Sequence, residues 1–169
     1  MILTRDALLA EIASGNVVID PYEPKLVGPA SIDLRLGGEL RVFVPGGEAI
    51  DLVDDIDPER WSRVAKIDGH YSLGPGETVL GITAERIRLA PNLCGWLEGR
   101  SRFARVGLMI HVTAGFLSPG IDNRQVLEIS NLSRRSLNLH PGTPICQIVV
   151  QRAEGSAVYS GRFAKQLKL

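Results

Sequence analysis

The chain has 169 residues, 44% of them hydrophobic, which is enough for one domain with its own core and too little for two ordinary domains. Nineteen basic residues balance nineteen acidic ones, so the net charge attracts neither nucleic acid nor an anionic membrane. No apolar run approaches the ~20 residues of a membrane span, and charges interrupt the N-terminal stretch where a signal peptide would be apolar. We therefore expect a cytoplasmic protein with a single domain over residues 1–169.

The first predicted element is a short helix that begins after Thr4, a suitable N-cap, and closes at Gly15. After it, turns built from glycine and proline recur every several residues, and short runs rich in β-formers lie between them. These predicted strands are Leu40–Val44, Thr78–Thr83, Leu108–Thr113, Val126–Ser130 and Ile145–Gln151. The pattern predicts an all-β domain, a sandwich or barrel, with little helix.

Two polar segments and two cysteines complete the outline. Residues 51–63 are predicted to form a long surface excursion, and residues 159–169 a basic tail that a ligand or neighbour would order. Cys94 and Cys146 lie in apolar segments, which favours buried free thiols over a disulfide or a metal pair.

A local anion site is predicted just after Gly99, where three arginines and Ser101 fall within seven residues. If Ser101 begins a helical turn, Arg102 and Arg105 share one face of it. Guanidinium groups bind phosphate oxygens bidentately, so this arginine turn suits a phosphate. The alternative interpretation is a solvated basic loop.

Glu128 is the candidate catalytic carboxylate. Strand alternation places Leu127 and Ile129 on one face and Glu128 on the other, fixed on a rigid element. Partial burial of such a carboxylate would raise its pKa toward the range useful for taking a proton from water. The alternatives are an exposed strand glutamate or a structural ion pair with an arginine.

Metal ligands are not evident in the sequence. His111 is a lone strand histidine, usually a structural residue, and His70 and His140 have no ligand-like spacing to it. Zinc nucleobase deaminases need H-x-E and P-C-x-x-C elements, and neither is present. The P-loop and G-x-S-x-G motifs are absent too, which argues against P-loop and serine-hydrolase chemistry.

These segments resemble the dCTP deaminase branch of the dUTPase-like superfamily. The resemblance rests on G-R-S-x-x-A-R-x-G at 99–107, H-x-T-A-G at 111–115 and L-E-x-x-N at 127–131, with weaker support from 29–37 and 141–147. It implies a distorted β-barrel of the jelly-roll type, a homotrimer with active sites between subunits, and a deoxynucleoside triphosphate, dCTP or dUTP, as ligand. It also implies Mg2+ held through the phosphates, without zinc.

The resemblance further implies roles for single residues. Glu128 would activate the water that attacks C4 of cytosine, while Ser101 and Arg105 would position that water. The implied nucleotide-binding residues are Arg100, Ser101, Arg102, Arg105, Val112, Thr113, Ala114, Gly115, Ser118, Gln147, Arg162 and Gln166. Residues 160–166 are similar to the family's closing segment S-x-K-Y-x-x-Q, which would cover the triphosphate.

Four positions bear on the choice of activity. Ser118 stands where the family usually has aspartate, which counts against diphosphatase activity because serine is no base at neutral pH. Arg102 replaces a serine, and Ile121 replaces a common aromatic residue. Gly115, however, resembles the branch in which deaminase and diphosphatase activities occur together.

Three hypotheses follow, in order of preference. The first is deamination of dCTP to dUTP. The second is a bifunctional deaminase and dUTP diphosphatase, or a plain dUTPase, giving dUMP and pyrophosphate. The third is a non-catalytic trimeric nucleotide sensor.

Overall fold

The structure is a computed structural model that describes residues 1–111 and 113–169. Its helical segments are α1 (Arg5–Ala13), η1 (Pro24–Leu26), η2 (Pro58–Trp61) and α2 (Ser101–Ala104). Its strands are β1 (Val17–Asp20), β2 (Ile32–Phe43), β3 (Ser62–Lys66), β4 (Tyr71–Leu73), β5 (Thr78–Leu89), β6 (Leu93–Gly99), β7 (Leu108–Ile110), β8 (Phe116–Leu117), β9 (Asp122–Asn131), β10 (Leu137–Leu139) and β11 (Pro144–Arg152). The predicted all-β class with one short N-terminal helix is confirmed.

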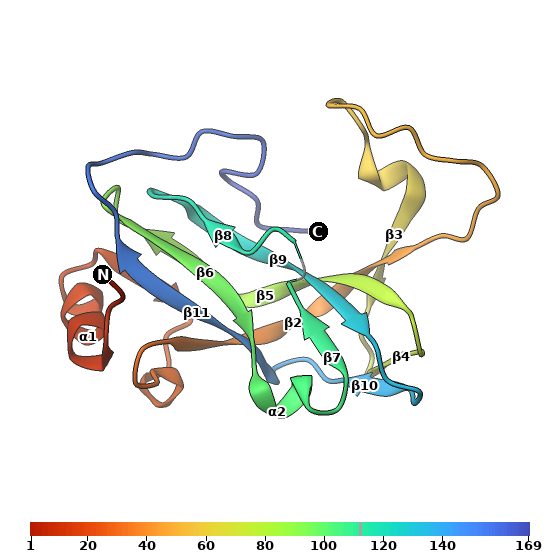
Figure 1. Cartoon of the computed structure of the whole chain (residues 1–169), viewed down its shortest axis with the longest axis horizontal. Coiled ribbons are helices and arrows are strands. Elements are labelled where there is room, and N and C mark those ends of the chain that lie inside the picture. The colour runs from red at the N-terminus through yellow and green to blue at the C-terminus, as the bar shows by residue number, and fades with distance from the viewer. Residues whose placement is uncertain (112) are drawn as a thin grey trace.

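The main sheet is antiparallel and has the strand order β7-β9-β5-β2-β11-β6-β8, with β1 added beside β5 and β3 beside β2. Strands β10 and β4 form a separate two-stranded ribbon. The sheet curls like a half-barrel, so that β6 and β11 lie across the core from β5 and β9 (Figure 1).

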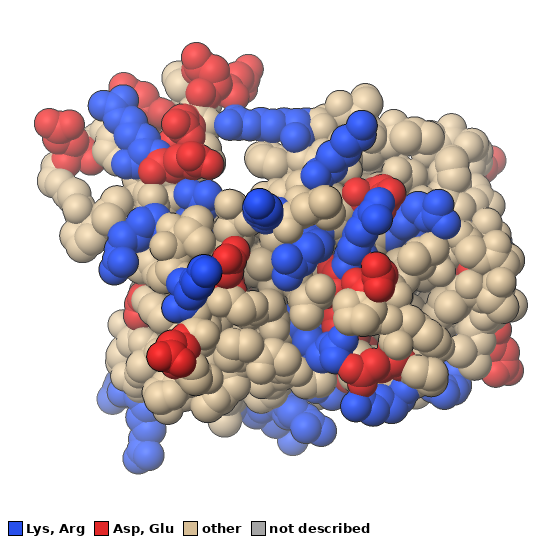
Figure 2. Space-filling view, turned by 180° about the vertical axis from the view of Figure 1, so that it is seen from behind, with Lys and Arg blue, Asp and Glu red and all other residues tan. Residues whose placement is uncertain are grey.

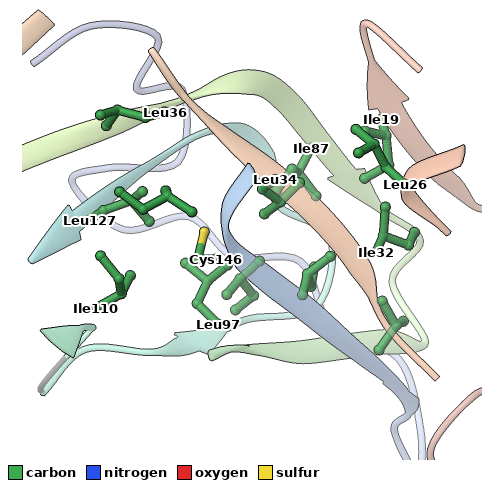
Figure 3. Close-up of a cluster of buried hydrophobic side chains, with 14 of the residues drawn as sticks. Ile19, Leu26, Ile32, Leu34, Leu36, Ile87, Leu97, Ile110, Leu127 and Cys146 are labelled. Carbon is green, nitrogen blue, oxygen red and sulfur yellow. The ribbon is translucent and has the colours of Figure 1, made fainter. Parts of the chain in front are cut away.

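The core fills the hollow of the curled sheet. Leu97, Ile110, Leu127 and Cys146 come from four different strands and meet there (Figure 3). Both cysteines are free and buried, as predicted, and burial raises the pKa of the Cys146 thiol well above its usual range. The thiol of Cys146 therefore acts as a small apolar side chain.

A buried polar group ties β2 to β5 where the ladder between β5 and β9 is irregular. The fully buried carboxylate of Glu85 accepts hydrogen bonds from the Arg35 backbone (2.9 Å) and from its Nε (2.6 Å). The Thr83 hydroxyl donates to the Glu85 carbonyl (2.7 Å) and accepts from the Gln125 backbone N–H (3.0 Å). The register shift between Ile82 and Arg86 is thus fixed by hydrogen bonds, which every buried polar group needs.

The predicted surface excursion is present as an arm, residues 44–61, which projects from the body between β2 and β3 (Figure 1). The arm carries six acidic residues: Glu48, Asp51, Asp54, Asp55, Asp57 and Glu59. Figure 2 shows acidic side chains gathered at this corner, whereas basic and acidic residues alternate over the rest of that face. In the part of the chain that the structure describes, no helix has the length and apolar character needed to cross a membrane.

One predicted strand is shorter than expected. The prediction extended it from Leu108 to Thr113, but β7 ends at Ile110. His111 has a φ of 57°, in the left-handed region that non-glycine residues rarely adopt, and this ends the strand. The change of direction brings Thr113 back over β9.

Candidate functional site

A cavity of about 570 Å³ lies between β9, the turn that follows β8, the arm and the C-terminal tail, residues 159–169. Five of the predicted site residues line it: Ala114, Ser118, Glu128, Arg162 and Gln166. The structure therefore brings the candidate carboxylate and the predicted closing segment to one place within a single chain.

Glu128 lines this cavity because alternation along β9 turns its side chain away from the core. Leu127 and Ile129 on the other face are fully buried, as predicted. The Thr113 backbone N–H donates to Oε2 of Glu128 (2.7 Å), and the Thr113 hydroxyl donates to Oε1 (2.6 Å). Two hydrogen bonds from one residue hold the carboxylate plane in a fixed orientation.

His111 is a cavity residue that the sequence-based prediction treated as structural. Its backbone N–H donates to the Glu128 carbonyl (2.8 Å). Its Nδ1 is buried and has no hydrogen-bond partner among residues 1–111 and 113–169. Burial lowers the pKa of His111, an effect that the nearby Glu128 carboxylate partly opposes. The lowered pKa favours the neutral form of the His111 imidazole beside the Glu128 carboxylate.

Arg41 is a second cavity residue that the sequence-based prediction missed. Arg41, Leu80 and Glu128 are cross-strand neighbours on β2, β5 and β9, so they form a row across the sheet. The buried guanidinium of Arg41 donates to the Ser62 hydroxyl (3.3 Å) and lies 3.6 Å from a Glu59 carboxylate oxygen. Arg41 thereby connects the sheet to the arm.

The arginine turn adopts the predicted helical form, α2, with Arg100 as its N-cap. The side chains of Ser101, Arg102 and Arg105 are exposed there. None of these four residues lines the cavity of its own chain, and α2 lies at the opposite end of the sheet from the tail (Figure 1). The two halves of the predicted site are therefore separate within one chain.

Arg100 and Gln147 are occupied by contacts near the turn. The Arg100 guanidinium lies 2.9 Å from an Asp33 carboxylate oxygen and donates to the Pro144 carbonyl (2.8 Å). Burial raises the pKa of Asp33, although Arg100 opposes this shift. Gln147 accepts a hydrogen bond from the Ser31 hydroxyl (2.6 Å). These contacts fix the base of α2.

Three further predicted site residues belong to the segment between β7 and β8. Thr113 is placed by its bonds to Glu128, and Val112 lies outside the described residues. The Gly115 carbonyl accepts from the Leu97 backbone N–H (2.8 Å), and a Cβ on Gly115 would lie 3.2 Å from the Leu97 carbonyl oxygen. Gly115 therefore allows the segment after β7 to pack closely against β6.

The three substitutions relative to the family pattern have different surroundings. Ser118 and Ile121 both line the cavity, and Ile121 is buried. At position 118 the wall offers a hydroxyl in place of a carboxylate. Arg102 is exposed on α2, away from both.

The described residues are compatible with Mg2+ held through the phosphates of a nucleotide. Among the described residues there is no group of three or more His, Cys, Asp or Glu side chains close enough to hold a metal ion. Mg2+ commonly keeps several waters and binds through the phosphates of its substrate, which requires no such cluster.

Comparison with known proteins adds an independent finding. The sequence model of the family described as dCTP deaminase-like matches residues 2–153. A Parafrankia sp. protein named "dCTP deaminase, dUMP-forming" is 38% identical over 181 residues, covering 98% of this chain and 87% of that protein. A Mycobacterium tuberculosis protein with the same name is 44% identical over 154 residues, covering 90% of this chain and 80% of that protein.

A solved structure shares the fold. The crystal structure of 2′-deoxycytidine 5′-triphosphate deaminase from Agrobacterium tumefaciens matches with a TM-score of 0.70 and 21% identity over 90% of this chain. This chain spans about half, 48%, of the length of that one.

Proposed function

The chain belongs to the dCTP deaminase-like family, and on that premise we propose that it hydrolyses dCTP to dUTP and ammonia and carries the dUTP on to dUMP and pyrophosphate. The observation that carries the first step is the Glu128 carboxylate, held by Thr113 at the wall of a cavity large enough for a nucleotide. The second step is supported by the names of the relatives, which are dUMP-forming.

Glu128 is proposed as the general base. The carboxylate takes a proton from a water whose oxygen forms a bond to C4 of cytosine. It then returns the proton to the exocyclic nitrogen, whose bond to C4 breaks, so that ammonia leaves. Backbone groups of residues 112 and 114 would read the base edge. The lowered pKa of His111 keeps its imidazole from adding a positive charge beside the carboxylate.

We assign the phosphates to Arg162 and Gln166, which line the same cavity. Residues 159–169 would close over the triphosphate and its Mg2+. Excluding water strengthens each charge contact inside such a site. The whole chain, residues 1–169, is proposed to act as one domain.

A second copy of the chain is proposed to complete the site. Ser101, Arg102 and Arg105 are exposed and distant from the cavity of their own chain, so a neighbour in a homotrimer would present them to it. Arg100, engaged by Asp33, would support the turn from beneath.

The products formed from dCTP and from dUTP test this function. We expect purified protein with Mg2+ to release ammonia and pyrophosphate from dCTP, with dUMP as the final nucleotide. Ion-exchange chromatography of the nucleotides, with an ammonia assay, measures both steps. A protein that binds both nucleotides and converts neither is a sensor, and the proposal is then wrong.

A second candidate is a deaminase that stops at dUTP. Ser118 favours it, because the cavity wall there offers a hydroxyl and no carboxylate base. Accumulation of dUTP from dCTP, with dUTP itself left unhydrolysed, would select this candidate.

Mixing two inactive variants tests the shared site. Glu128→Gln and Arg105→Ala chains should each be inactive alone, whereas trimers that contain both variants should recover about a third of the wild-type activity, since one of their three sites receives both intact groups. Co-expression with two different tags, followed by tandem purification, provides the mixture. As a control, Glu128→Gln chains mixed with chains carrying both substitutions should recover none. No recovery in the first mixture would place both groups in one subunit.

A further inference from the structure

The tail contacts a part of the β9 edge that no strand of the described residues covers. Strand β7 pairs only with the last residues of β9, from Ile129 to Asn131. Farther toward the start of β9, the Arg124 backbone N–H donates to the Gln166 carbonyl (2.8 Å). An exposed strand edge offers such donors to a neighbouring segment, and here the tail accepts one of them.

Asn123 adds a side-chain contact beside this one. Its side-chain amide is buried, with only 6% of the residue exposed, and its Nδ2 donates to the Phe163 carbonyl (2.8 Å). Its Oδ1 accepts a hydrogen bond from the Gln125 side chain, which fixes the amide orientation. The donor therefore points at the tail.

Arg124 makes the third contact. Its Nε donates to the Thr83 carbonyl (2.7 Å), and its guanidinium also reaches the Leu167 carbonyl (3.4 Å). A Cβ on Gly37 would lie 2.9 Å from this guanidinium, so the glycine leaves room for it. The side chain is thus held by β5 and directed to the tail.

The tail is also held at its other end. The Tyr159 backbone N–H donates to the Pro119 carbonyl (2.9 Å), and a Cβ on Gly120 would lie 2.9 Å from the Cα of Val158. Between these anchors, the Arg162 guanidinium donates to the Ile56 carbonyl of the arm (3.2 Å). Residues 159–167 therefore cross the cavity between fixed points.

We infer that Asn123 and Arg124 form a tail dock, which positions Arg162 and Gln166 against the phosphates of the bound nucleotide. The inference rests on the proposed function for its ligand, and it assigns the two residues to positioning rather than to the reaction. Asn123 and Arg124 contact backbone carbonyl groups of the tail, so these contacts do not depend on which side chains the tail carries. Its loss should weaken nucleotide binding and leave the reaction at Glu128 intact.

Trypsin reports on the dock in the full-length protein without any nucleotide. The bonds after Arg162 and Lys165 flank the docked carbonyls, while Arg60 in the arm gives an internal reference. In Asn123→Leu, which has a similar size but neither a donor nor a charge, we expect cleavage in the tail to rise about five- to tenfold, the effect of one lost hydrogen bond. Asn123→Ala should behave alike, and mass spectrometry gives the initial rates.

Kinetics then separate positioning from catalysis. Both variants should raise the KM for dCTP about five- to tenfold and keep kcat within about twofold of wild type. Asp122→Asn is the matched control, since the Asp122 carboxylate pairs with Arg86 outside the cavity, and it should change neither the tail cleavage nor the KM.

The outcomes are distinct. Faster cleavage of the tail together with a higher KM supports the dock. Wild-type cleavage in both variants overturns it, and faster cleavage with an unchanged KM overturns its role toward the nucleotide. If the wild-type protein fails to convert dCTP, the proposed function is wrong, while the cleavage rates still decide whether the dock exists.

Discussion

Replacing Glu128 by glutamine should lower the turnover of dCTP by about 10²- to 10⁴-fold, the usual contribution of a general base. Glutamine has the shape of glutamate, but its amide cannot take a proton from water. The amide oxygen can still accept from the Thr113 N–H, and the amide nitrogen can donate to the Thr113 hydroxyl, so the side chain keeps its position. Ammonia release under saturating dCTP measures the loss.

Binding and stability serve as controls for this variant. The dissociation constant for dCTP, measured by calorimetry, should stay within a few-fold of wild type, and the thermal unfolding midpoint should not change. Wild-type turnover in Glu128→Gln would remove Glu128 from the mechanism, whatever its place in the cavity.

Replacing Gly95 by alanine should destabilise the fold by about 3 kcal/mol, at the upper end of the usual cost of overpacking a core. Gly95 lies in β6, and a Cβ there would be 2.5 Å from the Val149 carbonyl oxygen of β11, closer than any real contact. The atom that must give way belongs to the backbone, so the two strands have to separate.

Gly38→Ala is the matched control, because a Cβ at this strand position meets nothing within 4 Å. It should change the free energy of unfolding by less than about 0.5 kcal/mol. Urea denaturation compares the two variants at one fixed protein concentration, because the apparent stability of a protein that assembles depends on its concentration. Equal midpoints would show that β6 and β11 tolerate the added methyl group.

The sequence predicted those features of the fold that depend only on neighbouring residues, such as the direction of side chains along a strand. Alternation from Leu127 to Ile129 places Glu128 correctly, since the period of a strand is fixed by its own backbone. The end of β7 was mispredicted because Leu108–Thr113 has strand-forming residues throughout, whereas the positive φ of His111 is imposed by packing against β9. Strand β9 begins earlier than expected, at Asp122, because the hydrogen bonds of its first residues come from β5.

Only some of the residues that line the cavity could be predicted from the sequence. Glu128 and the tail residues Arg162 and Gln166 do share a cavity, but Arg41 joins them through two strand pairings that span much of the chain. A short sequence motif does not indicate which distant strands will pair, so the position of Arg41 could not be predicted. The arginine turn precedes β9 by only two short strands, yet none of its residues lines the cavity to which Glu128 contributes, so sequence proximity alone does not place it.

The wall of the cavity draws on residues from β2 to the tail, from Arg41 to Leu169. During synthesis, a ribosome that has produced β2, β5 and even β9 has not yet delivered the segment that closes the pocket. Such a chain also lacks β11, which lies between β2 and β6 and contributes Cys146 to the core, so the core and the cavity both need the last part of the sequence. A truncation after β11 would therefore keep every strand of the sheet and remove the segment that crosses the cavity.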